Sequence, residues 1–333
     1  MHRAIYQDMR DALDEIPVIE THVHYTSTGE PQTDCMPIIL GYLKSDLRVC
    51  AGPDAGDLIR RLVDSRIPFK ERYTLFEKYY RCCAHTAYAR AMVRSLELCW
   101  GLKDAGYASL CQLNERLTER TNEYMQKCLR RANVRAQVAD IFEPRFFNIL
   151  SGRDTDYTPL SRFAFPLPAF HRIYDNASLE SVGRYIGAYP ESLDELADGI
   201  EGLLRKAKVW GAVCIKDQSA YFRTLDYGHP TYDQAEQAFN ALVSRPMEPL
   251  GFQNGKVLDD WLMQRCLTAA GRLSLPVQIH TGLQDRIAMH DDRNGGDIRA
   301  VNAALLIPTM ERHRRVRFDL FHANWPYMDE ILY

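Results

Sequence analysis

The chain has 333 residues, of which 46% are hydrophobic and 26% charged, a composition typical of a globular protein with a large core. Its formal net charge of −3 argues against nucleic acid or an anionic membrane as the main partner. No apolar run approaches the roughly 20 residues of a membrane-spanning helix, and the N-terminus has no apolar signal core. The nine cysteines are scattered, which fits reduced thiols. We therefore expect a soluble cytoplasmic enzyme with a small-molecule substrate, and leave homo-oligomer formation open.

The first strand follows a short amphipathic helix predicted over residues 2–15. Residues 17–24 begin apolar and β-branched, as a buried strand does, and end with His22 and His24. Side chains two residues apart on a strand point to the same side, so the two imidazoles converge where the chain leaves the sheet. Such a pair suits a divalent metal such as zinc. A bare His-x-His is equally consistent with two ordinary histidines on an exposed strand.

The segment 25–133 reads almost entirely as helices and predicts a helical insertion after the first strand. An aromatic and apolar stripe at i, i+4 spacing is expected to serve packing and not ligand binding. The stripe consists of Tyr88, Met92, Leu96 and Trp100. Expected helices span residues 54–63 with an Asp54 cap, 68–80, and 86–100 with Gly101 as its stop.

From residue 134 onward, short apolar runs alternate with helical stretches. This alternation predicts a parallel sheet, either a (β/α)₈ barrel or a doubly wound sheet. No glycine-rich phosphate loop follows the first strand, which weakens the nucleotide-binding alternative. The expected strands are 134–141, 163–167, 213–216, 276–280 and 316–322. The expected helices are 178–209, 234–243, 258–270 and 298–312.

Three later strands also end in residues that can do chemistry, namely Lys216, His280 and His322. In a parallel barrel, the carboxyl ends of the strands face one mouth, where the active site lies. Any one of these histidines could be a satisfied rim residue. Together with His22 and His24 they predict a site.

These strand ends resemble the amidohydrolase superfamily of metal-dependent barrels over nearly the whole chain. Residues 20–24 resemble its first-strand metal motif. Residues 215–223, 278–285 and 321–326 resemble the branch of uronate isomerase relatives and of the amidohydrolase-like domain in some glutamine-synthetase-like fusion proteins. The resemblance implies a TIM-type (β/α)₈ barrel with a helical insertion after strand one. It divides the chain into 1–24 (helix and first strand), 25–133 (insertion) and 134–333 (strands two to six).

The resemblance also implies roles. His22, His24 and His280 would bind a divalent metal, zinc in the first instance, and would leave a position open. His322 would be a further ligand or a general acid/base. Lys216 would either be carboxylated and bridge two metals or hold a substrate carboxylate as an ammonium, and we favour one metal.

Two residues just past the fourth expected strand are candidates for substrate binding, Tyr221 and Arg223. A planar guanidinium can grip a carboxylate with two hydrogen bonds. The alternative for Arg223 is a surface salt bridge.

One part of the family pattern has no counterpart. The family's last strand ends in a metal-binding aspartate, and this sequence has no candidate segment for strands seven and eight. Asp319 is not expected to replace it, because a residue three before His322 on a strand should face the other way. We therefore expect a chain that is truncated at its C-terminal end.

Three functions stay open at this point. The first is a metal-dependent hydrolase in which activated water attacks a carbonyl carbon of a small, carboxylate-bearing substrate. The second is a decarboxylase or a uronate-isomerase-like enzyme on the same barrel. The third is a non-catalytic domain that senses a ligand. Fold alone does not separate the first two, since one barrel hosts many reactions.

Overall fold

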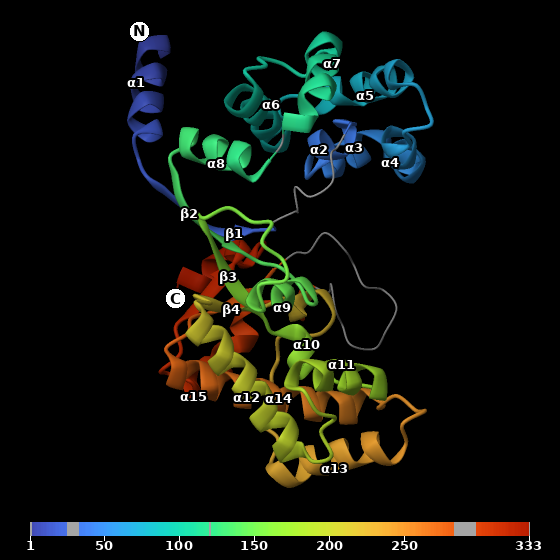
Figure 1. The fold of residues 1–333 in the computed structure, drawn as a ribbon, viewed down its shortest axis with the longest axis vertical. Helices are drawn as coiled ribbons and strands as arrows, with labels where there is room; N and C mark the ends of the chain where they lie inside the picture. The colour runs from blue at the N-terminus through green and yellow to red at the C-terminus, as the bar shows by residue number, and fades with distance from the viewer. Residues whose placement is uncertain (1, 25–32, 120, 283–297, 333) are drawn as a thin grey trace. The chain divides into compact units, whose positions relative to one another are not determined.

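The computed structural model describes residues 2–24, 33–119, 121–282 and 298–332 (Figure 1). It is an α/β protein whose six strands form one curled sheet in sequence order, from β1 to β6. The chain divides into two compact units. The first comprises residues 1–20, 26–137 and 156–161, and the second comprises residues 21–25, 138–155 and 162–333.

The first unit is mainly helical, as the sequence predicts. The helix α6 (Ala87–Trp100) begins where the Thr86 hydroxyl accepts a hydrogen bond from the Ala89 N–H, and it ends at Gly101, whose φ is 70°. The other helices are α1 (His2–Asp14), α2 (Met36–Leu40), α3 (Leu43–Ala51), α4 (Ala55–Val63), α5 (Phe69–Cys83), α7 (Tyr107–Arg116) and α8 (Asn122–Arg131). Asp54 is the N-cap residue of α4, as predicted, but its side chain makes no capping hydrogen bond, because Asp54 also closes the 3₁₀ turn Gly52–Asp54, which runs directly into α4.

The residues of the i, i+4 stripe of α6 make packing contacts, as expected, but all four also line a cavity of about 340 Å³. Leu96 is buried in the core of the first unit, and Met92 and Trp100 pack against that core. Tyr88 stacks on Tyr42 with 5.6 Å between ring centroids.

All six predicted strands are present within a few residues of their expected bounds. They are β1 (Val18–Val23), β2 (Val134–Ala139), β3 (Ser161–Pro166), β4 (Cys214–Asp217), β5 (Val277–His280) and β6 (Phe318–Phe321). The ladders from β3 to β6 are parallel. Lys216 is opposite Gln278, and His280 is opposite Phe321. Each of these strands therefore ends at the same edge of the sheet.

In the second unit, α14 packs against α10, α12 and α13 (Figure 1). Their bounds are α9 (Arg145–Leu150), α10 (Pro168–His171), α11 (Asn176–Ile186), α12 (Leu193–Trp210), α13 (Tyr232–Ser244), α14 (Phe252–Leu273) and α15 (Ile307–Arg312).

Two predicted helices differ from the structure. The stretch 178–209 is split, because α11 ends at Gly187, with φ at 98°, and α12 begins at its Ser192 cap. The stretch 298–312 is helical only from Ala303 onward. There the Asn302 side chain caps a 3₁₀ turn, and Pro308 lies in the first turn of α15, where its missing N–H is tolerated.

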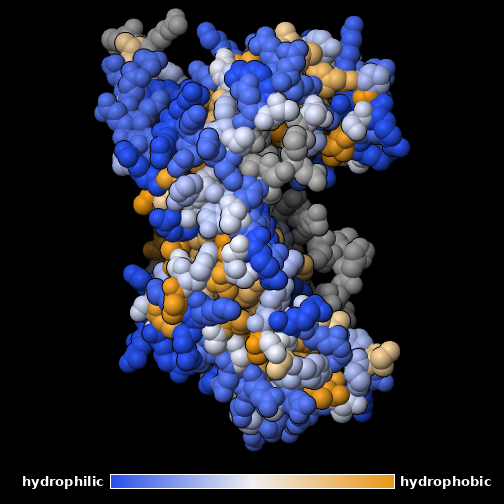
Figure 2. All heavy atoms as spheres, in the orientation of Figure 1, coloured by the Kyte–Doolittle hydropathy of each residue, from blue (hydrophilic) through white to orange (hydrophobic). Residues whose placement is uncertain are grey.

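Hydrophilic residues dominate the face drawn in Figure 2, with smaller hydrophobic areas between them. Among the described residues, none of the helices has the length and apolar character needed to cross a bilayer.

Candidate active site

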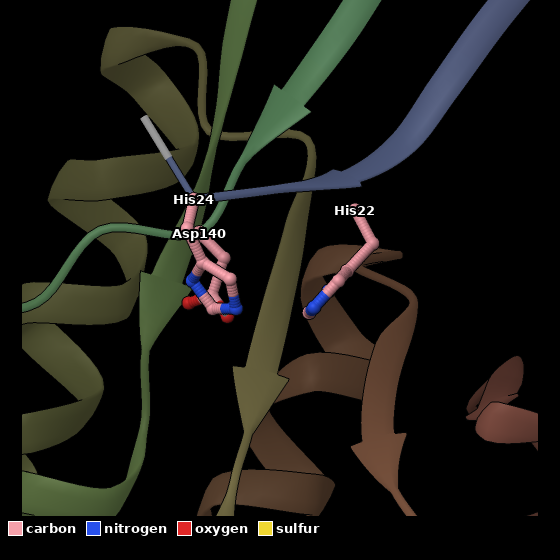
Figure 3. Close-up of side chains that lie close together, drawn as sticks. All are labelled: His22, His24 and Asp140. Atoms are coloured by element: carbon pink, nitrogen blue, oxygen red, sulfur yellow. The ribbon is translucent and has the colours of Figure 1, made fainter. Parts of the chain in front are cut away.

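Three side chains with metal-binding atoms meet at the carboxyl ends of β1 and β2. His22 lies in β1, His24 follows it, and Asp140 follows β2. One ligand atom from each lies within 4.8 Å of the others, and Figure 3 shows the three side chains extending to the same side of the strands. The Asp140 N–H donates to the Val23 carbonyl oxygen at 2.8 Å, so the backbone itself holds the two strand ends together.

Sequence reasoning missed Asp140. The signal was present, since Asp140 lies near the end of the expected strand 134–141, where the same argument selected Lys216, His280 and His322. A carboxylate at the end of a barrel strand faces the barrel mouth just as a histidine at that place does.

The donors fit a divalent cation. Asp140 is buried, and the Gln218 amide donates to its Oδ2 atom, while Oδ1 has no hydrogen-bond partner among the described residues. A buried carboxylate oxygen without a partner is costly in a protein interior. Two imidazoles with one carboxylate form a common catalytic set for zinc and for non-haem iron.

The imidazoles from distant parts of the chain gather as predicted. The ring centroid of His280 lies 6.1 Å from that of His22 and 4.1 Å from that of His322. His280 is buried, and its Nδ1 atom has no hydrogen-bond partner among the described residues. It is not one of the three clustered donors, so its role as a ligand stays a prediction.

These histidines are held in the neutral form that a metal requires. Burial, helped by the charge of Lys216, lowers the pKa of His22 to about 3. Burial followed by the charge of His322 lowers the pKa of His280, and burial also lowers the pKa of His322. All three are therefore neutral near pH 7, and each has one ring nitrogen that carries a lone pair.

Lys216 is fully buried beside this cluster. Its Nζ atom lies 3.2 Å from Nδ1 of His22 and 3.7 Å from the centroid of the Phe321 ring. Burial lowers its pKa to about 8, although the charges of Asp140 and Asp217 favour the ammonium. A lysine with a lowered pKa can act as an ammonium or become carboxylated, so both sequence alternatives stay open.

His322 lies on an unusual turn at the end of β6. His322, Ala323 and Asn324 have positive φ angles of 68°, 50° and 55°, a conformation that costs free energy in residues other than glycine. The buried Asn324 side chain compensates, because it accepts from the Ala303 N–H at 2.7 Å and donates to the Tyr327 carbonyl at 2.9 Å.

The end of β5 supports the same turn. The Thr281 hydroxyl donates to the Phe321 carbonyl at 2.6 Å. Gly282 has φ at 70°, and a Cβ atom there would lie 2.4 Å from the Trp325 carbonyl oxygen. The motif over residues 278–285 thus has a structural reason at Thr281 and Gly282, while residues 283–285 lie outside the described residues.

The expected orientation of Asp319 is wrong. Asp319 is opposite Gln278 in the ladder, and the Gln278 amide donates to Asp319 Oδ2 at 3.3 Å. Asp319 therefore shares a sheet face with Gln278 and His280. The prediction assumed that side chains alternate between the two faces from Asp319 to His322. It fails because β6 ends at Phe321, and His322 has a positive φ that is not a strand conformation.

The two residues predicted to bind substrate lie in different surroundings. The Tyr221 ring is next to His280, with 4.8 Å between centroids. Arg223 is 2% exposed and forms ion pairs with Asp259 at 2.8 Å and Asp260 at 2.6 Å. Its ion pairs are internal ones and not the surface salt bridge of the sequence alternative.

Arg223 belongs to a buried polar network behind β4. His171 contacts Asp259 through Nδ1, and its Nε2 atom lies 3.5 Å from Asp217. The Tyr174 hydroxyl donates to Asp259 at 2.6 Å. Because Asp217 follows Lys216 directly, this network fixes the end of the strand that carries the lysine.

No protein-family model matches the sequence, and no curated protein matches it. Among solved structures, the chain is similar to a uronate isomerase from Thermotoga maritima, with a TM-score of 0.69 and 14% identity over 93% of this chain and 71% of that one. The chain is also similar to a glucuronate isomerase from Caulobacter crescentus, with a TM-score of 0.68 and 14% identity over 93% of this chain and 69% of that one. A third similar structure is a chain from Lactobacillus casei that is assigned only provisionally as a metal-dependent hydrolase. Its TM-score is 0.55, with 14% identity over 96% of this chain and 70% of that one.

The chain has the uronate isomerase fold. The predicted barrel class is thereby confirmed. Within the uronate isomerase fold, the candidate residues lie at the carboxyl ends of the strands, where barrels of this kind place their active sites.

Proposed function

We propose that this protein is a metal-dependent isomerase of a small sugar acid that interconverts the aldose and ketose forms of a uronate. The observation that supports it most is the meeting of His22, His24 and Asp140 beside Lys216 and His280 at the strand ends. The isomerase names of two similar structures favour this reaction over hydrolysis.

His22, His24 and Asp140 would hold the metal, with His280 beside them. A divalent cation there would polarise the carbonyl oxygen of the substrate. Lys216 as an ammonium would hold an anionic substrate oxygen close to the cluster, and the Tyr221 hydroxyl would orient the sugar chain.

The reaction needs a residue that moves a proton. The aldose loses the proton on C2 and gains a proton on C1. Its C2 hydroxyl loses a proton to become the ketone, and its C1 carbonyl oxygen gains a proton to become a hydroxyl, so no co-reactant is needed. His322 suits this task, because it is neutral, its side chain is still reached by solvent although partly covered, and its ring lies 4.1 Å from that of His280.

Hydrolysis is the second candidate. The same donors would suit the attack of water on an amide or lactone carbonyl, with Lys216 carboxylated between two metals. The provisional hydrolase name of the Lactobacillus casei structure supports it.

One experiment separates the two. The purified protein, loaded separately with zinc, manganese and ferrous iron, is incubated in D₂O with D-glucuronate and D-galacturonate, and the products are followed by NMR. Conversion to the ketose, with solvent deuterium at the carbon that receives the proton in at least part of the product, is expected. Loss of this conversion is expected in His24→Ala and in Asp140→Asn, while Asp233→Asn, an exposed change on α13, serves as the matched control. Turnover of N-acyl or lactone compounds without any isomerisation would contradict the proposal.

A further inference from the structure

The second unit also has a hollow away from the candidate active site, and arginines line it. It has a volume of about 880 Å³ and lies between the start of α13, the second half of α14, and the end of α15 with the residues that follow it. The three helices are labelled in Figure 1. None of the candidate active-site residues lines it.

Five arginines line this hollow, and most of them lack an acidic partner. Arg272 pairs with Glu201 at 2.5 Å. No carboxylate of the described residues lies within ion-pair distance of the other four, and Glu311 is the one acid among the described lining residues. The four are Arg265, Arg312, Arg314 and Arg315. Their excess charge is notable in a chain with a formal net charge of −3.

The segment that carries three of these arginines is fixed to α14. His313 Nε2 lies 2.6 Å from Oε1 of Gln264, whose amide also donates to the Gly228 carbonyl at 2.8 Å. A Cβ atom on Gly271 would lie 3.5 Å from Cβ of Arg315, so the two backbones approach closely. The packing therefore fixes the backbone that carries these exposed arginines around one hollow, and their positive charge attracts an anion there.

The hollow also has an apolar floor. Trp261, Leu267 and Val316 contribute to it, and the Arg265 guanidinium lies 5.7 Å from the Trp261 ring. The volume falls in the range of roughly 300 to 1,000 Å³ that small-molecule sites occupy. A hollow of this size, which is open to solvent on one side, fits a small ligand better than an extended nucleic acid.

We infer that this arginine hollow binds a small anion that carries two or more phosphate groups. The guanidinium fork matches phosphate oxygens with two parallel hydrogen bonds. Several guanidinium groups around one hollow match a ligand with several phosphate groups. This site is independent of the proposed metal centre and of its reaction.

The test is calorimetric titration of the full chain with sodium tripolyphosphate at low and at physiological salt. Saturable binding is expected, weaker at higher salt. The double variant Arg312→Gln/Arg315→Gln should weaken it at least tenfold. The control Arg184→Gln/Arg245→Gln removes two exposed arginines from elsewhere in the unit and should leave binding unchanged. The turnover of the enzyme should be the same in both double variants.

Three results would overturn the inference. The first is an absence of binding at millimolar tripolyphosphate, and the second is equal weakening in the control variant. The third is loss of binding in His24→Ala with retention in Arg312→Gln/Arg315→Gln, which would place the phosphate at the metal centre. A hexaglutamate peptide serves as a parallel arm. Tighter binding of this peptide than of tripolyphosphate would also overturn the inference, because it would assign the hollow to an acidic protein segment.

Discussion

The Nζ atom of Lys216 lies 3.2 Å from Nδ1 of His22. When Lys216 is a neutral amine, its Nζ atom accepts from the Nδ1–H group, and the Nε2 lone pair of His22 is left for a metal, whereas an ammonium donates to Nδ1 and leaves the ring hydrogen on Nε2. A lysine buried in β4 thus sets which nitrogen of a β1 histidine can bind. Groups that orient a metal ligand in this way are often as important as the ligand itself.

Removal of the Lys216 acceptor should therefore weaken the metal site. We expect Lys216→Met to lower metal affinity by roughly ten- to a hundredfold, the usual effect of losing an orienting partner. Lys216→Gln keeps an acceptor in its side-chain carbonyl oxygen and should lose less. Competition titrations with a chelating dye measure both, and equal affinities in the parent and the methionine variant would contradict this role.

Asp140 should be a metal ligand although sequence reasoning overlooked it. We expect Asp140→Asn to retain much less metal after dialysis, because the amide removes the negative charge that two neutral imidazoles do not supply. Metal analysis by mass spectrometry gives the ratio of ions to chains. A ratio unchanged from that of the Asp233→Asn control would show that the carboxylate is not a ligand.

Gly282→Ala should disturb His322 without touching the metal cluster. The added Cβ atom would meet the Trp325 carbonyl oxygen at 2.4 Å, and the backbone φ of 70° is itself unfavourable for alanine. We expect turnover to fall at least tenfold while metal content stays near the parent value. Gly251→Ala, where a Cβ atom meets nothing within 4 Å and φ is negative, is the matched control.

Arg223→Gln should destabilise the second unit strongly. The change leaves Asp259 and Asp260 as buried carboxylates without their guanidinium partner. Breaking a buried pair in this way typically costs about 3–5 kcal/mol. Urea unfolding of the parent and the variant measures the difference. A loss below about 1 kcal/mol, the value of an exposed pair, would contradict the buried role.

Stability should fall as the pH rises through the alkaline range. Burial disfavours the protonated form of His171, but Asp259 and Asp217 outweigh it and raise the pKa of His171 to about 9. A histidine whose pKa rises on folding contributes its full stability below pH about 6.5, and this contribution disappears as the pH passes about 9. Unfolding measured across this window should show the loss, and His171→Gln should flatten that part of the profile. If the free energy of unfolding falls with pH equally steeply in the parent and in the variant, His171 is not the source of the pH dependence.

The sheet was predictable because its signals are local. Each strand is a short apolar run, and each expected range contains the strand or overlaps it closely. The histidines were predictable for the same reason, since strand ends in a parallel sheet share one edge. The helix boundaries were less so, because Pro308 and the Gly187 break act through single residues.

What the sequence did not reveal depends on three-dimensional packing. The burial of Arg223 results from acids on α14, which lie 36 and 37 positions further along the chain. The orientation of Asp319 could not be derived from alternation, because the left-handed turn that begins at His322 breaks the period. Asp140 is different, since the reasoning that found its neighbours applied to it as well.

The order of the strands also determines the sequence of events during synthesis. β1 and β2 are neighbours in the sheet and together supply His22, His24 and Asp140. A nascent chain on the ribosome has therefore exposed this whole triad before β4 is translated. Lys216, His280 and His322 are translated later, on strands that follow in the same order along the sheet. An ion captured at that early stage would tie the first two strands together while the rest of the protein is still being made.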